Sequence, residues 1–499
     1  MSGRVRSPSD VLPRVARGAE QPMRLAGHVT ARTVTGPNAG LTRATLIVTD
    51  ALAFVAAMVF VSIGSSFFGD AAWVVTAAWM WPLPALCMLG FVLVGLYPGV
   101  GFGPVEELRR VTLVVTGFHV LTLLVFFYVG VDSIGWPLAL VASSVVVTGS
   151  VLAGRAAVRS LVSRQDWWGV PVVVLGAGPM ADALIRSVKQ NPGLDLKVIG
   201  FFDDVLREDR EGVPHLGSLD DIDSVAKRFR FKRALITISD LTSETLGRLL
   251  DRHATVLHEA FVVPGPFGPP VLGLAAHGLG GKLVLRSPHH LAFRINRWAK
   301  RVLDLVLLVP LVLMSTPVLL VAVAAVLLSS RGKPFYAQPR EGYQGRVFNV
   351  WKLRTMHTGA DALLVRHLAE NPDARDEWQR TFKLKNDPRV VPVIGHFLRR
   401  TSIDELPQLW NVLVGEMSLV GPRPFPQYHL AQFSPEFRAL RKSVLPGVTG
   451  LWQVSVRSDG DLEVQEQLDT YYIRNWSMWF DLYLLLRTPF AVLFSRGAY

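Results

Sequence analysis

The sequence is poor in cysteine and in charged residues. It contains one cysteine, Cys87, which excludes a disulfide framework and a cysteine-ligated metal site. Only 18% of its 499 residues are charged, whereas 50% are hydrophobic. Such a chain is too apolar for an ordinary soluble protein, and its composition predicts membrane spans. The Gly-x-x-x-x-Gly-Lys-Ser/Thr motif is also missing, which excludes a P-loop kinase.

The charges that are present favour the positive sign. The formal net charge is +12 at pH 7, which suits a protein that rests on an anionic leaflet or handles phosphorylated substrates. Nucleic-acid binding is the other interpretation, but the basic residues flank hydrophobic segments, so we interpret them as topology signals and expect no nucleic-acid partner. Residues 1–42 are rich in Arg, Pro and Gly, and we expect a disordered cytoplasmic tail rather than a cleaved signal peptide.

Four apolar segments predict four transmembrane helices within residues 43–155. Each is long enough to cross a hydrocarbon core, which takes about 17–25 residues. The links after the first and third segments lack Lys and Arg, whereas the other flanks are basic, so both ends of this unit are predicted to be cytoplasmic. Asp50 lies inside the first segment, either as a functional residue or as an interhelical hydrogen-bonding group. The segments lie near 44–67, 71–97, 111–131 and 136–153.

Residues 165–290 have the composition of an α/β domain. The β-branched run Val170–Leu175 ends in a Gly176-Ala177-Gly178 turn before a helical pattern, and strand-like runs return at Lys197–Phe202 and Arg233–Ser239. Strands that alternate with helices predict a small parallel, Rossmann-like sheet. The turn resembles a dinucleotide-binding fingerprint, or it only supplies the small residues that a strand–helix turn needs. Ligand binding, regulation and homodimer formation all stay open for this domain.

A further apolar run, 302–328, has a proline near its middle. Basic residues precede it (Arg294–Arg301) and follow it (Arg331 and Lys333), so the positive-inside rule places both ends in the cytoplasm. Pro317 breaks or kinks a helix, and the Ser and Thr hydroxyls just before it can satisfy the freed carbonyls. We therefore predict a re-entrant helix–break–helix that enters one leaflet and returns. The alternative is a fifth full span, which would place the rest of the chain outside the cell, against the charge rule.

Two adjacent carboxylates, Asp404 and Glu405, are the strongest catalytic candidates. They follow Arg399 and Arg400, and they could divide the work, with one attacking a phosphorus atom while the other holds Mg²⁺ against a diphosphate. Alternatively, Ser402-x-x-Glu405 is a capping box that only satisfies a helix N-terminus. Pro407 disfavours a helix that begins at Ser402, and a later start would leave both carboxylates at an electropositive helix end.

Basic residues upstream of these carboxylates are suited to binding phosphates. Lys352 and Arg354 alternate on a predicted extended segment, so their side chains point the same way and form a basic pair. Further along, Arg399 and Arg400 lie beside the two carboxylates. We expect Lys352, Arg354 and Arg400 to steady the phosphates of a substrate.

Sequence runs in the last third of the chain carry a family resemblance. They are Lys300-Arg301-x-x-Asp304, Lys352–Met356, Thr401–Asn411, Met417–Pro424 and Pro446–Gln453. From about residue 297 to 499, the sequence resembles the bacterial sugar transferase family, the monotopic polyprenyl-phosphate phosphoglycosyl transferases. The resemblance implies a re-entrant membrane helix, Mg²⁺ dependence and a ping-pong reaction. It also implies that Asp404 is the nucleophile, Glu405 the Mg²⁺ ligand and Arg423 a nucleotide contact.

The upstream part resembles the long form of this family, in which four membrane helices and a Rossmann-like domain precede the catalytic module. The runs Phe382–Arg389 and Arg496–Tyr499 look most like those of undecaprenyl-phosphate galactose phosphotransferases. This implies transfer of hexose-1-phosphate, with galactose favoured and glucose as the alternative, from UDP-hexose to undecaprenyl phosphate with release of UMP. The expected setting is the bacterial inner membrane, in contact with its lipids, with the catalytic module in the cytoplasm. The expected role is the first step of exopolysaccharide, capsule or O-antigen synthesis.

One position departs from the family pattern. Val456 stands where the family usually has Gly in a Ser-Gly-Arg turn, and a β-branched residue does not readily adopt a positive φ. The departure concerns the turn at Arg457, the last of the predicted substrate-binding residues.

Two rival classes of function fit the sequence less well. A membrane-bound nucleotide-sugar dehydratase or epimerase acting through the Rossmann-like domain would need Tyr-x-x-x-Lys, and no tyrosine has Lys four places on. A non-catalytic membrane scaffold for polysaccharide assembly would not need Asp404 and Glu405 with their surrounding Arg and Lys residues.

Overall fold

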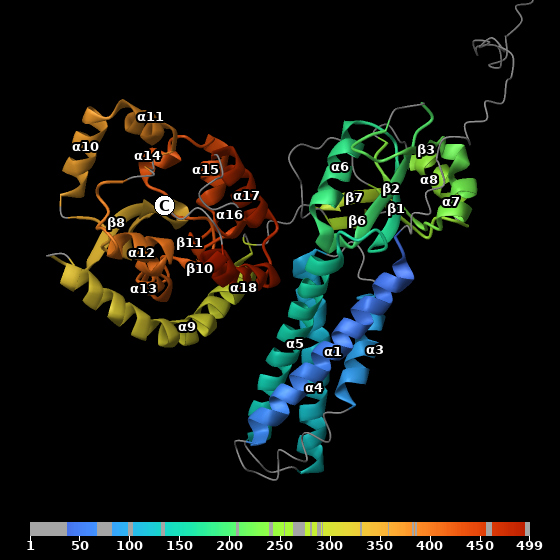
Figure 1. The fold of residues 1–499 in the computed structure, drawn as a ribbon, viewed down its shortest axis with the longest axis horizontal. Coiled ribbons are helices and arrows are strands. Elements are labelled where there is room, and N and C mark those ends of the chain that lie inside the picture. The colour runs from blue at the N-terminus through green and yellow to red at the C-terminus, as the bar shows by residue number, and fades with distance from the viewer. Residues whose placement is uncertain are drawn as a thin grey trace, which may run out of the picture.

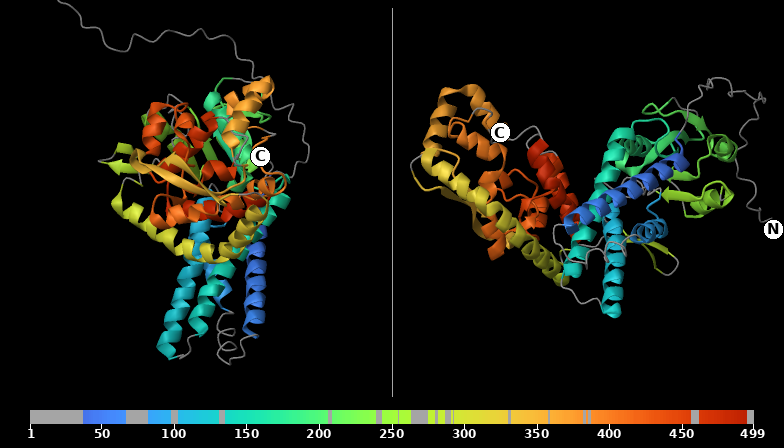
Figure 2. Two further views of the ribbon diagram at one scale, coloured as in Figure 1. Left: turned by 90° about the vertical axis from the view of Figure 1, so that its left-hand side faces the viewer. Right: turned by 60° about the horizontal axis from the view of Figure 1, so that its bottom comes forward.

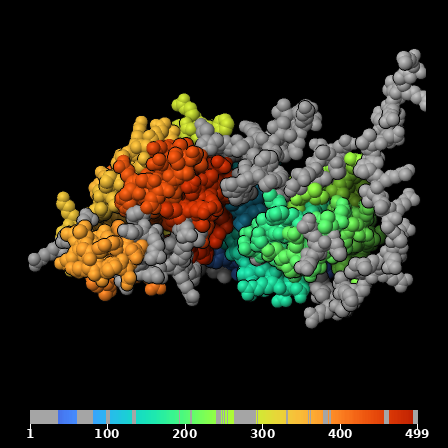
Figure 3. Space-filling view, turned by 90° about the horizontal axis from the view of Figure 1, so that it is seen from above, coloured from blue at the N-terminus to red at the C-terminus, as the bar shows by residue number. Residues whose placement is uncertain are grey.

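The computed structural model of the protein has three parts (Figure 1): a bundle of apolar helices, an α/β domain at one end of the bundle, and a C-terminal module beside both. Viewed along the bundle from that end, the α/β domain and the C-terminal module lie side by side (Figure 3). The described residues are 37–66, 82–97, 103–130, 135–205, 209–238, 243–253, 255–262, 275–279, 282–286, 291, 293–329, 332–357, 359–381, 384, 387–455 and 462–494.

The bundle consists of α1 (Ala39–Ser66), α3 (Leu83–Leu93), α4 (Pro104–Val129) and α5 (Gly135–Val162). Within the described residues, α1, α4 and α5 are long and apolar enough to cross a membrane, as predicted, while α3 is a shorter apolar helix. The predicted second span, 71–97, is described only from Pro82 onward. Helix α5 continues to Val162, beyond the predicted apolar segment 136–153, and this last part carries two arginines that pair with buried carboxylates.

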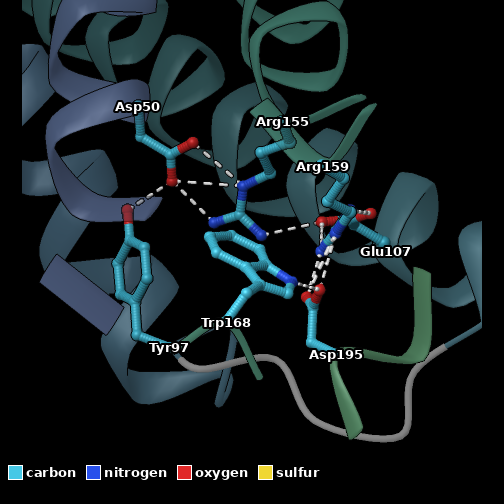
Figure 4. A network of polar contacts seen from close by, with 7 residues as sticks. All are labelled: Asp50, Tyr97, Glu107, Arg155, Arg159, Trp168 and Asp195. Atoms are coloured by element: carbon cyan, nitrogen blue, oxygen red, sulfur yellow. Dashed lines mark hydrogen bonds and ion pairs between the residues drawn. The ribbon is translucent and has the colours of Figure 1, made fainter. Parts of the chain in front are cut away.

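The first of those arginines, Arg155, contacts acidic residues of the neighbouring helices (Figure 4). The fully buried Arg155 guanidinium donates to Asp50 of α1 at 2.6 Å and to Glu107 of α4 at 2.9 Å. The Tyr97 hydroxyl donates to the same Asp50 carboxylate. Asp50 thus joins an ion-paired network between helices, which is more than the single interhelical hydrogen bond that we considered.

The network continues into the α/β domain (Figure 4). Arg159 of α5 pairs with Glu107 at 2.6 Å and with Asp195 at 2.8 Å. Trp168 donates its indole N–H to Asp195 at 3.1 Å. Asp195 lies just before the second strand of the domain, so the same charges fix the bundle and the α/β domain to one another.

The α/β domain is built on a parallel five-stranded sheet with strand order β3-β2-β1-β4-β5. The central β1 coincides with the predicted run Val170–Leu175, and all six of its residues are buried, because helices cover both faces. The parallel α/β prediction is confirmed. The other elements are α6 (Pro179–Gln190), β2 (Leu196–Phe202), β3 (His215–Gly217), α7 (Ile222–Phe229), β4 (Arg233–Ile236), α8 (Ser243–Arg252), β5 (Glu259–Val262) and an antiparallel pair, β6 (Ala275–Leu279) and β7 (Lys282–Arg286).

The turn after β1 needs glycine at its first position. Gly176 has φ +101°, and a Cβ there would lie 2.8 Å from the Ile238 side chain. The next amide, that of Ala177, donates to the Asp203 carboxylate at 2.8 Å. Asp203, which follows β2, therefore accepts a hydrogen bond from one backbone amide of the turn that resembles a dinucleotide fingerprint.

The C-terminal module begins with α9 (Arg294–Ser329) and an antiparallel hairpin of β8 (Phe335–Glu341) and β9 (Val347–Leu353). Its main core includes Val412, Leu419, Tyr472 and Leu484. The remaining elements are α10 (Ala360–Glu370), α11 (Pro372–Thr381), α12 (Ile394–Arg400), the 3₁₀ turn η5 (Ile403–Glu405), α13 (Gln408–Val414), β10 (Ser418–Val420), α14 (Gln427–Leu430), α15 (Pro435–Arg441), β11 (Gly447–Thr449), α16 (Leu451–Ser455), α17 (Leu462–Arg474) and α18 (Met478–Phe494).

Helix α9 is apolar and carries the predicted proline at its middle. It is one continuous helix through Pro317 and it bows along its length (Figure 1), so the predicted break at this point is wrong and a bend takes its place. The helix stays intact because Pro removes only one amide donor. The Thr316 hydroxyl donates to the Val312 carbonyl at 2.7 Å.

Both ends of α9 are fastened to the C-terminal module. Near its start, Lys300 pairs with Asp481 of α18 at 2.6 Å. Near its end, Val326 packs in a small core cluster with Leu398 of α12. The middle has no such cover, and Met314 is 78% exposed. In the view from the side of the module (Figure 2, left), α9 lies level with one end of the bundle, and the bundle helices extend well beyond it.

Candidate active site

The adjacent carboxylates lie in the short turn η5 between α12 and α13. Ser402 precedes the turn in a left-handed conformation (φ +55°), and its hydroxyl makes no capping hydrogen bond. The capping-box alternative is therefore wrong. Helix α13 begins later, with Pro407 as its N-cap residue, so the missing amide hydrogen of the proline costs the helix no hydrogen bond. Asp404 and Glu405 consequently precede the first turn of α13.

Glu405 is held by two cations. Its Oε1 atom accepts hydrogen bonds from the Lys352 ammonium at 2.7 Å and from the Arg423 guanidinium at 2.8 Å. Burial alone would raise the pKa of Glu405, but Arg423 and Lys352 outweigh it and lower the pKa to about 2. Glu405 is therefore ionised at any pH at which the protein works.

Asp404 has the opposite surroundings. Its residue is only 8% exposed, and within the described part of the chain its carboxylate makes no hydrogen bond or ion pair. Burial raises its pKa to about 6, and the charge of Glu405 adds to the rise against the nearby Lys352 and Arg399. An unbonded carboxylate with a pKa near neutrality is available as a nucleophile.

The arginine next to Asp404 is Arg399 rather than Arg400. Arg399 is half-buried at the end of α12, and its Nε donates to the Thr355 hydroxyl at 3.1 Å. Arg400 is exposed and, within the described residues, forms no hydrogen bond or ion pair with either carboxylate. Adjacent helical residues point about 100° apart, so only one of the two faces the site. Arg399 lies four residues after Gly395, on the face that approaches Thr355, and a Cβ on Gly395 would lie 2.5 Å from the Thr355 carbonyl.

Lys352 reaches Glu405 from β9, and a buried amide side chain holds that strand. The Asn411 side chain of α13 accepts from the Trp351 amide at 3.1 Å and donates to the Asn349 carbonyl at 2.8 Å. Arg354 lies just beyond the end of β9. No hydrogen bond or ion pair within the described residues joins Arg354 to Glu405 or Asp404, so of the predicted basic pair only Lys352 contacts the acidic residues.

Arg423 reaches Glu405 from the loop after β10, and close backbone packing holds that loop. The Gly421 amide donates to the Thr449 carbonyl, and the Gly447 amide donates to the Pro422 carbonyl, both at 2.9 Å. A Cβ on Gly447 would lie 2.0 Å from the Gly421 nitrogen. Arg340 of β8 is a further cation near Arg423. Burial and the Arg423 charge lower the pKa of Arg340 to about 10.

The predicted substrate-binding residue Arg457 and the unusual Val456 before it lie outside the described residues. Within the described part of the chain, no group of three or more His, Cys, Asp or Glu side chains is placed to hold a metal ion. A cation at Asp404 and Glu405 would therefore need oxygen ligands from a substrate or from water.

Comparison with known proteins bears on this arrangement. A family model described as "Bacterial sugar transferase" matches residues 295–495. The "UDP-galactose-lipid carrier transferase" of Erwinia amylovora is 34% identical over 367 residues, which cover 69% of this chain and 73% of that protein. The chain belongs to the bacterial sugar transferase family. The predicted membership in this family is confirmed.

Other relatives of this sugar transferase carry two kinds of name. The "Undecaprenyl-phosphate galactose phosphotransferase" of Salmonella typhimurium is 32% identical, over 69% of this chain and 72% of that protein. The "UDP-glucose:undecaprenyl-phosphate glucose-1-phosphate transferase" of Escherichia coli K12 is 33% identical, over 65% of this chain and 67% of that protein. A second family model, described as "CoA-binding domain", matches residues 93–258 of the sugar transferase, from the end of α3 to just before β5.

Proposed function

We propose that this sugar transferase moves hexose-1-phosphate from a UDP-hexose to undecaprenyl phosphate through a covalent aspartyl intermediate. The observation that carries the proposal is the contrast between two adjacent carboxylates. Glu405 is fixed by two cations, whereas Asp404 is buried, unbonded within the described residues and has a pKa of about 6. A purely structural acid would be paired, because burial of an unpaired charge is costly.

The chemistry balances as two displacements at one phosphorus atom. An Asp404 carboxylate oxygen attacks the sugar-bearing phosphorus of UDP-hexose, a P–O bond forms, and the bond to the bridging oxygen breaks so that UMP leaves with the electron pair. The phosphate oxygen of undecaprenyl phosphate then attacks the same phosphorus and releases the Asp404 carboxylate. The resulting undecaprenyl-diphosphate hexose begins a polysaccharide such as an exopolysaccharide, capsule or O-antigen.

The residues present fit Mg²⁺. Glu405 has both cations on Oε1, and its Oε2 atom makes no hydrogen bond within the described residues. Oxygen atoms of Glu405 and Asp404 are the hard ligands that Mg²⁺ prefers, and Mg²⁺ is commonly held by one or two carboxylates together with substrate phosphates. Bound there, Mg²⁺ would neutralise diphosphate charge and stabilise the departing UMP. Lys352 and Arg423 keep Glu405 ionised and oriented.

We further propose that α9 is re-entrant and that the catalytic module is cytoplasmic at the bacterial inner membrane. The support is that both ends of α9 pack against the same module while its apolar middle is bare. A helix that crossed the bilayer would place its two ends on opposite sides of a hydrocarbon core about 30 Å thick, and a single module could not then bind both ends. UDP-sugars are then on the correct side of the membrane to reach Asp404.

Galactose is the hexose that we propose first, with glucose as the alternative. Two relatives, 34% and 32% identical, are named for galactose, and one that is 33% identical is named for glucose. The deciding experiment follows radiolabel transfer from UDP-galactose and from UDP-glucose to membrane lipid, using membranes that contain the wild-type protein. Transfer from one donor at more than about tenfold the rate of the other would assign the sugar. A tenfold difference in rate corresponds to about 1.4 kcal/mol of transition-state free energy.

The same assay tests the roles of the two carboxylates. Asp404→Asn should abolish transfer and labelling of the protein, whereas Glu405→Gln should reduce both and weaken the response to Mg²⁺. Label should accumulate on the wild-type protein when donor is supplied without lipid acceptor. Transfer by Asp404→Asn at the wild-type rate would rule out Asp404 as the nucleophile, and a complete lack of transfer by the wild type from any UDP-hexose would favour the scaffold alternative.

A further inference from the structure

A buried ion pair contacts the backbone of Arg423. Arg441, the last residue of α15, pairs with Asp469 of α17 at 2.8 Å. Both side chains are buried, and neither contacts Asp404 or Glu405. Burying a charged pair far from water costs free energy, so a buried pair this near the catalytic groups calls for a functional explanation.

The Arg441 guanidinium contacts more than its acidic partner. Its Nη1 donates to Asp469, and its Nη2 donates to the backbone carbonyl of Arg423. The planar group also lies over the Phe425 ring, 4.7 Å from its centroid, and beside Phe437 at 5.5 Å. One rigid cation therefore ties α17 and an aromatic cluster to the backbone of the residue that binds Glu405.

The Arg423 backbone is constrained on both sides of this contact. Pro422 and Pro424 have φ fixed near −65° by their rings, and the Pro422 carbonyl is held by the Gly447 amide. Residues 421–426 are otherwise buried, and Arg423 alone among them is partly exposed. The Arg423 carbonyl is the next group along the chain, and fixing it leaves the side chain directed at Glu405.

We propose that Arg441, held by Asp469, is a positioning residue that sets the direction of Arg423 and thereby the hold on Glu405. The role rests on the proposed function, because Glu405 matters only if hexose-1-phosphate transfer occurs there. Arginine is needed at this position because its fork donates in two directions while its plane stacks on Phe425. A lysine keeps the charge for Asp469 but has a single ammonium in place of the fork.

The test is a double-mutant cycle in the full-length protein, reconstituted in lipid nanodiscs and assayed for UDP-hexose-dependent transfer. We expect Arg441→Lys alone to lower kcat/KM on the order of 10²-fold, the loss that a displacement of about 1 Å can cause. In the Arg423→Lys background, the same substitution should lower kcat/KM less than about threefold, because residues that act through one another are not additive. The loss of kcat/KM should divide between kcat and KM in the same way in the two single variants.

A matched control distinguishes positioning from loss of structure. Arg301 also uses its guanidinium to hold backbone carbonyls, those of Val412 and Leu413, so Arg301→Lys removes a comparable anchor elsewhere in the module. Its effect should be equal in the wild-type and Arg423→Lys backgrounds.

Hydrogen exchange gives a second readout that needs no activity. The peptide covering residues 417–430 should exchange faster in Arg441→Lys and in Asp469→Asn, but not in Arg301→Lys. Equal losses from Arg441→Lys in both backgrounds, or unchanged exchange in this peptide, would overturn the proposal. Absence of transfer by the wild type would instead contradict the proposed function, while the exchange result would still decide whether Arg441 holds this segment.

Discussion

At the scale of single residues, Asp404 and Glu405 carry the same carboxyl group but differ in the residues that surround it. Both are removed from water by the same turn, but only Glu405 has Lys352 and Arg423 within hydrogen-bonding distance. Two neighbouring carboxylates with widely separated pKa values can take different chemical roles at one pH. The cations thus decide which of the two acids is free to react.

The raised pKa of Asp404 predicts an acid limb in the pH dependence of transfer. Only the carboxylate form is nucleophilic, so below about pH 6 the value of kcat/KM should fall tenfold per pH unit, and above it kcat/KM should level off. A bound cation favours the ionised form, so higher Mg²⁺ concentrations should move the limb to lower pH. The measurement is kcat/KM from pH 4.5 to 8 at several Mg²⁺ concentrations. A limb that stays near pH 4 at every Mg²⁺ concentration would contradict the assignment.

The sequence identified the acidic residues and two of their cations but not the full set of partners. Lys352 and Arg423 could be predicted because they lie in runs typical of the family. Arg399 was missed in favour of Arg400, because adjacent helical residues differ by about 100° in direction and only the packing against Thr355 selects one of them. Arg441 and Asp469 are far apart in sequence, and no local pattern indicates that they form an ion pair next to the Arg423 backbone.

At the scale of elements, the site depends on a loop and a strand that touch through their backbones. The loop after β10 carries Arg423, and Gly447, the first residue of β11, has the amide that holds the Pro422 carbonyl. Backbones approach this closely only where a side chain is missing. Glycine at this position therefore allows β11 to set the position of the loop that carries Arg423.

Gly447→Ala should both destabilise the module and weaken transfer. The added Cβ would lie 2.0 Å from the Gly421 nitrogen and 2.5 Å from the Thr449 carbonyl, and these are backbone atoms that cannot rotate away. Overpacking of this kind costs about 1–3 kcal/mol, and any shift of the loop displaces Arg423. The measurement is the apparent Tm at a fixed scan rate, together with the transfer rate. Gly193→Ala is the control, since nothing lies within 4 Å of a Cβ there, and an equal loss in both variants would refute the explanation.

Elements were predicted well where local periodicity determines them and less well where distant contacts do. The run Val170–Leu175 became β1 with the same bounds, because an uninterrupted β-branched run suits a strand buried on both faces. Arg155 was interpreted only as a basic residue that flanks the fourth apolar segment. In the structure its charge is paired with Asp50 and Glu107, and nothing in the local sequence reveals those partners.

At the scale of the whole molecule, α4 connects the three parts. Its first turn carries Val105, which packs against the main core of the C-terminal module, and Glu107, which joins the buried network of the bundle. The network ends on Asp195 of the α/β domain through Arg159. The orientation of the α/β domain relative to the bundle therefore depends on a few buried charges.

Arg159→Met should loosen the α/β domain from the bundle. The substitution leaves the buried Asp195 carboxylate without its guanidinium, and breaking a buried pair in this way costs about 3–5 kcal/mol. The linker between α5 and β1 contains the exposed Arg164, so cleavage by trypsin after Arg164 in nanodiscs should become faster. Arg186→Met removes only an exposed ion pair with Glu211 and should leave the cleavage rate unchanged.

A second substitution should reverse much of this effect. Burial already raises the pKa of Asp195, against the opposing influence of Arg159, so its charge is the costly feature once the guanidinium is gone. Asp195→Asn removes that charge, still accepts the Trp168 N–H, and suits the left-handed backbone at this position, where φ is +51°. The double variant Arg159→Met/Asp195→Asn should therefore be cleaved after Arg164 more slowly than Arg159→Met alone. Equally fast cleavage of the two would show that lost packing, and not an unpaired buried charge, releases the domain.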